Sequence, residues 1–486
     1  MTINPNLLRL AGVALSDVLS NTGPADVKLG WFFKQNRDLG TKDRAFIAES
    51  AYGVLRRKSF LTYVAGGDDP RKLLVAYLVR VLGMSTRDLA DTLNAQQKEW
   101  ALEIKSKKTD DISKAMQADL PEWFWDKLVE QYGDEQALTI ARSMHQPAAL
   151  DLRVNLVKTT REDVMAKFAS EKTEVVPTPY SPNGLRMAQK MTISRHVLFT
   201  DGKIEVQDEG SQLLAQLVAP RRGEMVADFC AGAGGKSLAL GALMRNSGRI
   251  YAFDVSEKRL QNLGTRLKRS GLSNLHSQLI SSEADPKLKR LNGKFDRVLV
   301  DAPCSGLGTL RRNPDLKWRQ KPQDVLELTV KQTNILARAS KLVKAGGRLI
   351  YATCSLLQDE NEQIAEAFLK ANPEFVLVPA NAILAQQQIN LDTGNYLKLL
   401  PHLHQTDGFF AGVFEKASAV KSALDNTSEK AEVVAEADEV KVKADRKKAA
   451  ISKSKAVTKA AAVKVPVKVP VKKSATKKAV PQKAKA

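Results

Sequence analysis

The sequence predicts an α/β fold with a mainly parallel sheet, preceded by a helical region and a small α+β module. Between residues 208 and 416, apolar runs of strand length alternate with amphipathic helical runs, which is typical of a parallel sheet. Residues 1–145 keep helical apolar spacing instead. Residues 417–486 are rich in Lys, Ala, Val and Pro and hold almost no large apolar residue, so we expect them to be disordered.

The helical region carries the usual start signals of helices. Apolar residues from Leu7 to Leu19 recur at helical spacing, Thr41 is a candidate N-cap for a helix reaching Arg57, and Pro70 is expected to begin another helix. Packing within a helical bundle alone explains every apolar position here.

The small α+β module is expected over residues 146–207. Short strands are predicted at 150–154, 175–176, 185–187 and 196–199, with one short helix capped by Thr160. The domain that follows, residues 208–416, alternates strands with helices. Its predicted strands are 225–229, 249–253, 275–280, 297–300, 348–352, 375–378 and 409–414. Its clearest helices are 256–270, 324–343 and 359–371.

Most of the positive charge lies in the C-terminal tail. The chain has a net charge of +21, and residues 440–486 hold 16 Lys and Arg with one acidic residue, which leaves only +6 elsewhere. Such a polycation binds nucleic acid nonspecifically by releasing counterions, or it serves as a dispensable solubilising tail, and composition fits both equally.

The chain has three cysteines, Cys230, Cys304 and Cys354. A small, odd number of cysteines argues against a disulfide framework and favours a reducing compartment. No apolar run reaches the length of a membrane span, and the N-terminus lacks the layout of a signal peptide. We therefore expect a soluble, cytoplasmic, monomeric protein without a membrane partner and without a metal site.

A glycine-rich loop at residues 228–237 follows a predicted strand and opens a helix. It fails the P-loop pattern, because Cys230 stands where glycine is needed, and it fails the dinucleotide pattern at Ser237, which disfavours a nicotinamide oxidoreductase. Asp254 ends the next strand, where a carboxylate accepts hydrogen bonds from ribose hydroxyls. The pattern fits an adenosine without a pyrophosphate, such as S-adenosylmethionine. Cys230 is expected to be a small buried lining residue, while Lys236 either contacts the cofactor or continues the helix.

Two cysteines lie in distinctive motifs, each directly after a predicted strand. Cys304 belongs to Asp-Ala-Pro-Cys-Ser-Gly at 301–306, and Cys354 to Thr-Cys-Ser at 353–355. Thiols at the carboxyl ends of strands in one open sheet can face the same crevice. That placement suits covalent chemistry on a flat electrophile.

Together these motifs resemble the Sun-type RNA cytosine-C5 methyltransferases, the nucleolar-protein/Sun family. The resemblance rests on residues 230–236, Asp254, 301–306, 311–318, 353–355 and 407–410. It covers about 150–416, and the stretches 39–44 and 52–57 are similar to the NusB-like domain of the bacterial ribosomal-RNA members. It implies a Rossmann-like S-adenosylmethionine methyltransferase domain at 208–416 behind a NusB-like RNA-binding domain at 1–145.

The resemblance also implies roles for single residues. Cys354 would add to carbon 6 of cytosine as the nucleophile, and Cys304 would assist release of the methylated RNA. DNA-type enzymes instead place the nucleophile in the Pro-Cys motif, and on that pattern Cys304 would attack. Asp301 would contact the ring nitrogen and the exocyclic amine, and it is a candidate proton donor. The implied cofactor-binding residues are Cys230, Ala231, Gly232, Ala233, Gly234, Gly235, Lys236, Asp254, Asp285 and Asp301.

The sequence departs from the family at two places. The family loop usually reads Cys-Ala-Ala-Pro-Gly-Gly-Lys, whereas Gly232-Ala233 replace Ala-Pro here, which should loosen the loop. A Gly-Asp pair usually supplies a further cofactor carboxylate, and here we expect Asp285, with Glu283 as the alternative, to contact the adenine amine. Arg311 and Arg312 are expected to grip RNA phosphates in preference to being solvated.

The leading hypothesis is an S-adenosylmethionine-dependent RNA cytosine-C5 methyltransferase acting on small-subunit ribosomal RNA. A target base within a helix would have to be unstacked to reach the crevice. One alternative is a transfer-RNA cytosine-C5 methyltransferase. Another is a noncatalytic RNA-binding assembly factor, against which the presence of Cys354, Cys304 and Asp301 counts.

Overall fold

The computed structural model describes residues 3–20, 22–189 and 191–418. The prediction of a disordered tail concerns residues that, from 419 onward, lie outside this described part. Within the described residues, no helix has both the length and the apolar character that crossing a membrane requires.

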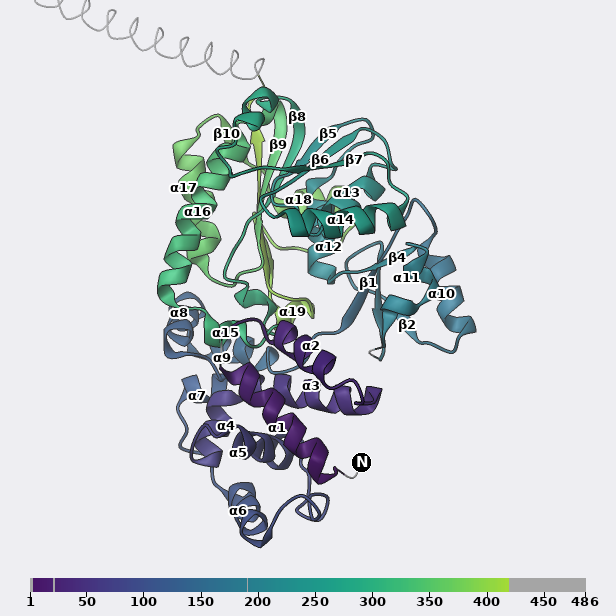
Figure 1. The fold of residues 1–486 in the computed structure, drawn as a ribbon. Helices are drawn as coiled ribbons and strands as arrows, with labels where there is room; N and C mark the ends of the chain where they lie inside the picture. The colour runs from purple at the N-terminus through teal and green to yellow at the C-terminus, as the bar shows by residue number, and fades with distance from the viewer. Residues whose placement is uncertain (1–2, 21, 190, 419–486) are drawn as a thin grey trace, which may run out of the picture. The chain divides into compact units, whose positions relative to one another are not determined.

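The N-terminal region is helical, as predicted (Figure 1). Its helices are α1 (Pro5–Leu19), α2 (Ala25–Gln35), α3 (Thr41–Arg56), α4 (Lys58–Ala65), α5 (Pro70–Ala76), α6 (Ala95–Ser106), α7 (Lys114–Ala118), α8 (Glu122–Tyr132) and α9 (Asp134–Ser143). Helices α1–α6 share one apolar core, while α7–α9 pack against leucines of the C-terminal domain. The predicted N-cap at Thr41 is wrong, because Gly40 caps α3 and Thr41 is its first helical residue.

A small antiparallel sheet follows, with strand order β2-β3-β1-β4. Its elements are β1 (Leu150–Val154), α10 (Arg161–Ser170), β2 (Val175–Pro177), β3 (Gly184–Met187), α11 (Val197–Thr200) and β4 (Ile204–Val206). The strand predicted at 196–199 is wrong. The His196 ring accepts a hydrogen bond from the Leu198 N–H and thereby caps the short helix α11.

The large sheet has the strand order β10-β12-β9-β8-β5-β6-β7, with β11 paired to β12. Its strands are β5 (Met225–Asp228), β6 (Arg249–Asp254), β7 (Leu275–Leu279), β8 (Phe295–Asp301), β9 (Val343–Thr353), β10 (Phe375–Leu377), β11 (Leu397–Leu399) and β12 (Phe409–Lys416). Strands β5 to β9 run parallel, and β12 pairs antiparallel with β9. The α/β fold with a mainly parallel sheet is thus confirmed, and β11 is an addition.

Helices cover both faces of this sheet (Figure 1). One face carries α12 (Glu209–Val218), α13 (Gly235–Leu243), α14 (Glu257–Ser270) and α18 (Ala380–Gln386). The other carries α16 (Pro322–Ser340) and α17 (Glu362–Ala371), and short helices α15 (Leu316–Arg319) and α19 (Pro401–His404) lie in connections. After β7 the chain returns to the opposite side of β5, so the strand order reverses between β5 and β8. Open α/β sheets bind ligands at such a point, outside the carboxyl ends of the strands.

The segment that follows Cys304 ties the helical region to the sheet domain. The indole N–H of Trp318 donates to the Leu55 carbonyl over 2.8 Å, and the Lys317 ammonium donates to the Arg56 carbonyl over 2.9 Å. Asp315 accepts the backbone N–H of Ala25 at the start of α2. The N-terminal helices therefore support the same connection that leads out of the Pro-Cys motif.

Candidate active site

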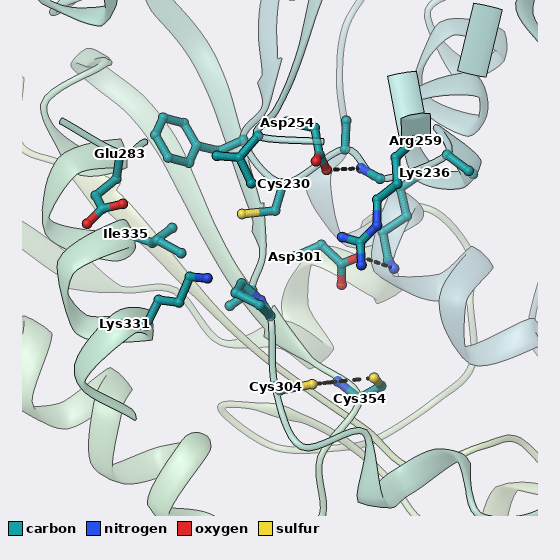
Figure 2. A pocket seen from close by; sticks show the side chains of 18 of the residues that line it. Cys230, Lys236, Asp254, Arg259, Glu283, Asp301, Cys304, Lys331, Ile335 and Cys354 are labelled. Atoms are coloured by element: carbon teal, nitrogen blue, oxygen red, sulfur yellow. Dashed lines mark hydrogen bonds and ion pairs between the residues drawn. The ribbon is translucent and has the colours of Figure 1, made fainter. Parts of the chain in front are cut away.

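A cavity of about 420 Å³ opens at the carboxyl ends of β5, β6, β8 and β9. Figure 2 shows Asp254 and Glu283 near one end of it and the thiols of Cys304 and Cys354 at the other, with Asp301 between them. Every one of these side chains stands in the loop that follows a parallel strand or at the end of that strand. The parallel order of the strands therefore brings the motifs of four separate segments together.

The glycine-rich loop between β5 and α13 turns sharply under this cavity. Gly232 has a φ of +57° and Gly234 a φ of +80°, which favours glycine at both positions. A Cβ on Gly234 would lie 2.0 Å from the side chain of Leu263, whereas one on Gly232 would meet nothing. Beneath the loop, the Ser237 hydroxyl donates to Asp228 over 2.6 Å, and burial raises the pKa of Asp228 to about 7.

Asp254 is positioned by the loop it faces. Its carboxylate accepts the Gly232 N–H over 2.8 Å and the Ser256 N–H over 2.7 Å. A carboxylate offers about four acceptor positions, so two remain for ligand hydroxyls. The expected ribose contact of Asp254 is therefore compatible with its surroundings.

The structure places Glu283, and not Asp285, on the cavity. The Asp285 carboxylate accepts the backbone N–H groups of Ser281 and Lys287, both over 2.9 Å, and caps the helical turn that begins at Pro286. The expectation for Asp285 is corrected on this ground, because Asp285 does not line the cavity, whereas Glu283 does.

Lys236 and Asp301 form an ion pair of 2.7 Å inside the cavity. Burial alone would lower the pKa of Lys236, but the facing Asp301 carboxylate outweighs it and raises that pKa above its ordinary value. Lys236 thus does more than continue α13. Arg259 and Lys331 also line the cavity, and sequence reasoning did not single out either residue.

The two motif cysteines lie against each other, as their positions after neighbouring strands β8 and β9 led us to expect. Their Sγ atoms are 3.4 Å apart, and the backbone N–H of Cys354 also points at the sulfur of Cys304. Both are free thiols. The contact with Cys354, together with burial, raises the pKa of Cys304 well above its ordinary value. Cys230 lines the cavity separately, and burial raises the pKa of its thiol too.

Glu360 and Asn361, which the sequence did not single out, form hydrogen bonds with both cysteine motifs. The buried Glu360 carboxylate accepts the backbone N–H of Ser305, over 2.8 Å, and its hydroxyl. Asn361 donates its amide to the Ser355 carbonyl and accepts the hydroxyl of Thr353. Because they bond to the neighbours of each cysteine, these side chains fix the distance between the thiols.

Arg311 and Arg312 are engaged within the protein, which contradicts the expectation that they grip phosphates. Arg312 binds Asp208 over 2.8 Å and Asp407 over 2.6 Å, and both carboxylates are nearly inaccessible. Arg311 donates to the backbone carbonyls of residues 405 and 406. These arginines tie the segment after Cys304 to the start of β12 and of α12. Because both guanidinium groups bond within the protein, neither side chain is simply solvated.

The fold and the cavity define a Rossmann-like methyltransferase, and comparisons with known proteins agree. The family model "16S rRNA methyltransferase RsmB/F" matches residues 215–415, and the ferredoxin-like domain of RsmF/B-like methyltransferases matches residues 120–194. The chain belongs to this RsmB/F family of ribosomal RNA methyltransferases, which confirms the resemblance to Sun-type enzymes.

Similar proteins span nearly the whole described chain. The probable ribosomal RNA small subunit methyltransferase B of Synechocystis sp. is 31% identical over 446 residues, 84% of this chain and 99% of its own. The ribosomal RNA small subunit methyltransferase B of Shewanella oneidensis is 30% identical, over 85% of this chain and 100% of its own. The crystal structure of PH0851 has a TM-score of 0.69 at 26% identity, over 86% of this chain and 100% of that one.

The cofactor is S-adenosylmethionine, and the residues of the cavity fit it. The backbone at Gly232 is open to close approach, Asp254 keeps free acceptor positions for a ribose, and Glu283 offers a carboxylate for an adenine amine. No pyrophosphate-binding pattern is needed for this molecule. When bound, it supplies an electrophilic methyl group.

Proposed function

We propose that this chain methylates carbon 5 of a cytosine in small-subunit ribosomal RNA, with Cys354 as the covalent nucleophile. The observation that carries the proposal is the pair of free thiols, 3.4 Å apart, at one end of the cofactor cavity. A single cysteine would suffice to line a pocket. Two thiols in contact at the ends of adjacent strands fit a reaction that adds and later expels a sulfur nucleophile.

The contact between the thiols supports the assignment of their roles. Because the pKa of Cys304 is raised, Cys304 keeps its proton at neutral pH. We assign the attack to Cys354, whose thiol gives up its proton before its sulfur bonds to the ring. Its sulfur forms a bond to carbon 6, and the electron pair of the carbon 5–carbon 6 double bond becomes available at carbon 5.

The Lys236–Asp301 pair can donate a proton to the cytosine ring and later take it back. As carbon 6 is attacked, ring nitrogen 3 takes up a proton from Asp301 while Lys236 passes one to Asp301, so the pair gives up one proton in total. The proton returns when the ring regains its double bond. The 2.7 Å distance between the two side chains supports this relay.

Release of the product reverses the addition. Cys304 first loses its own proton to solvent. The resulting thiolate takes the proton from carbon 5, the double bond re-forms, and the bond from carbon 6 to the Cys354 sulfur breaks with its electron pair returning to sulfur. The raised pKa of Cys304 makes that thiolate a strong base.

The substrate proposal is tested by mapping 5-methylcytosine in total RNA. The cells compared are those with the gene, those without it, and deletion cells complemented by wild type, Cys354→Ala or Cys304→Ala. We expect one site in 16S ribosomal RNA to vanish on deletion and to return only with wild type. Loss of a transfer-RNA site would instead support the transfer-RNA alternative. If no site is lost from any RNA, the noncatalytic assembly factor becomes the better account.

A further inference from the structure

Two carbonyl groups of the cofactor loop are held from outside the loop, one by the small antiparallel sheet and one by α14. Arg153 of β1 donates to the Gly235 carbonyl over 2.7 Å. Arg266 of α14 donates to the Ala233 carbonyl over 2.8 Å, and the same guanidinium binds Glu205 of β4 over 2.9 Å. Strands β1 and β4 pair side by side, so this side of the small sheet bonds the Gly235 carbonyl directly through Arg153 and supports the Ala233 carbonyl through the Glu205–Arg266 pair.

The side chains that support the cofactor loop from the small sheet are charged and buried. Arg153 and Glu205 are only 5% and 3% exposed. Burial lowers the pKa of Arg153 to about 10, so its guanidinium is still charged at neutral pH. Glu205 is the carboxylate that offsets this charge, and it also binds Arg266 and Arg269. Because a buried charge is costly without a partner, removing Glu205 would leave these guanidinium groups uncompensated beside the loop.

The loop itself has little intrinsic rigidity. Ala233 lies between Gly232 and Gly234, and Gly235 follows. Glycine permits many backbone conformations, and no proline fixes φ within this turn. On the cavity side, Asp254 holds the Gly232 N–H. On the opposite side, the loop is fixed by the arginine contacts from the small sheet and α14.

We propose that the small sheet is the positioning device of the cofactor loop, with Arg153, Glu205 and Arg266 as positioning residues that set the affinity for S-adenosylmethionine. The inference rests on the cofactor site alone and stands or falls independently of the cytosine chemistry.

The test is calorimetric binding of S-adenosylmethionine to the full chain without RNA. We expect Glu205→Gln to raise the Kd about tenfold, with kcat at saturating cofactor changed much less. Arg186→Gln is the matched control. It breaks the 2.7 Å ion pair with Asp151 in the same sheet, and this pair does not contact the loop, so the Kd should stay at the wild-type value.

If Glu205→Gln does not fold, two further variants test the same effect on cofactor affinity. Arg266→Met removes the bond to the Ala233 carbonyl from a helix surface and should raise the Kd similarly. Adding Ala233→Pro should recover part of the lost affinity, because proline fixes φ where the contacts no longer do. A folded Arg266→Met protein with the wild-type Kd, or a loss equal to that of Arg186→Gln, would overturn the inference.

Discussion

Cys304 and Cys354 carry the same thiol group, and the short contact between them affects which of the two keeps its proton. The side chains lie 3.4 Å apart, and this contact together with burial raises the pKa of Cys304, outweighing the backbone N–H of Cys354, which by itself would lower that pKa. A pair of thiols this close does not ionise twice at neutral pH, because the second negative charge would face the first. In the mechanism we propose, the pair therefore holds one proton, which lies on Cys304 while Cys354 reacts.

This assignment predicts that product release accelerates with pH. The pKa of Cys304 is raised by Cys354 and by burial, and burial persists when Cys354 is bound to RNA. Below that pKa the thiolate fraction grows about tenfold for each pH unit, so release should grow in proportion. The measurement is a pH jump on a preformed enzyme–RNA adduct, followed by the rate at which free RNA appears. A release rate that stays flat between about pH 6 and about pH 9 would rule out Cys304 as the base.

Single residues were predictable where a motif marks the end of a strand. Cys304, Cys354 and Asp254 each follow an apolar run, and the structure brings them to one cavity. Glu283 and Asp285 were interchanged, because a short irregular loop has no periodicity that tells which carboxylate faces outward. Other supporting residues bond to partners far away in the chain, which no local pattern reveals. Glu360, Arg153 and Glu205 are of this kind.

At the scale of elements, Arg312 joins the segment after Cys304 to α12 and β12. It pairs with Asp208 and Asp407, and burial raises the pKa of Asp407 to about 6 despite the facing arginine. Loss of the guanidinium would leave two buried carboxylates unpaired. The arginine is therefore a structural clamp between three elements.

Arg312→Ala should lower the free energy of unfolding by about 3–5 kcal/mol at neutral pH. The loss should shrink as the pH falls, because the folded variant then binds more protons than the unfolded chain and protonation neutralises Asp208 and Asp407. Urea unfolding at several pH values measures this. Unchanged stability, together with a reduced salt dependence of RNA binding, would restore the phosphate-binding interpretation.

Elements with a strong apolar pattern were predicted well, and short polar ones were not. Every strand predicted in the large sheet is present. The central strands β5, β8 and β9 are buried on both faces, which requires nearly continuous apolar sequence. Strand β11 has only three residues and gave no such signal. The helix α11 was mistaken for a strand, because its four residues are too few to display helical spacing and its cap comes from the His196 ring.

At the scale of the whole molecule, charge is divided between a nearly balanced body and a basic tail. Residues 440–486 hold +15 of the total +21. Truncation after residue 418 should weaken RNA binding and flatten its salt dependence, because fewer counterions are released, while the Kd for S-adenosylmethionine stays the same. Filter binding over a series of salt concentrations measures the slope. An unchanged slope would favour the solubilising role of the tail.

The most direct test of the covalent proposal is trapping of the enzyme on RNA. The full chain as Cys304→Ala, as Cys354→Ala and as wild type is incubated with unmethylated 16S ribosomal RNA and S-adenosylmethionine, then denatured and separated by electrophoresis. With Cys354 as nucleophile and Cys304 as the base for release, only Cys304→Ala should accumulate a covalent protein–RNA band, and Cys354→Ala should form none. A band from Cys354→Ala, with none from Cys304→Ala, would contradict the assignment and make Cys304 the nucleophile.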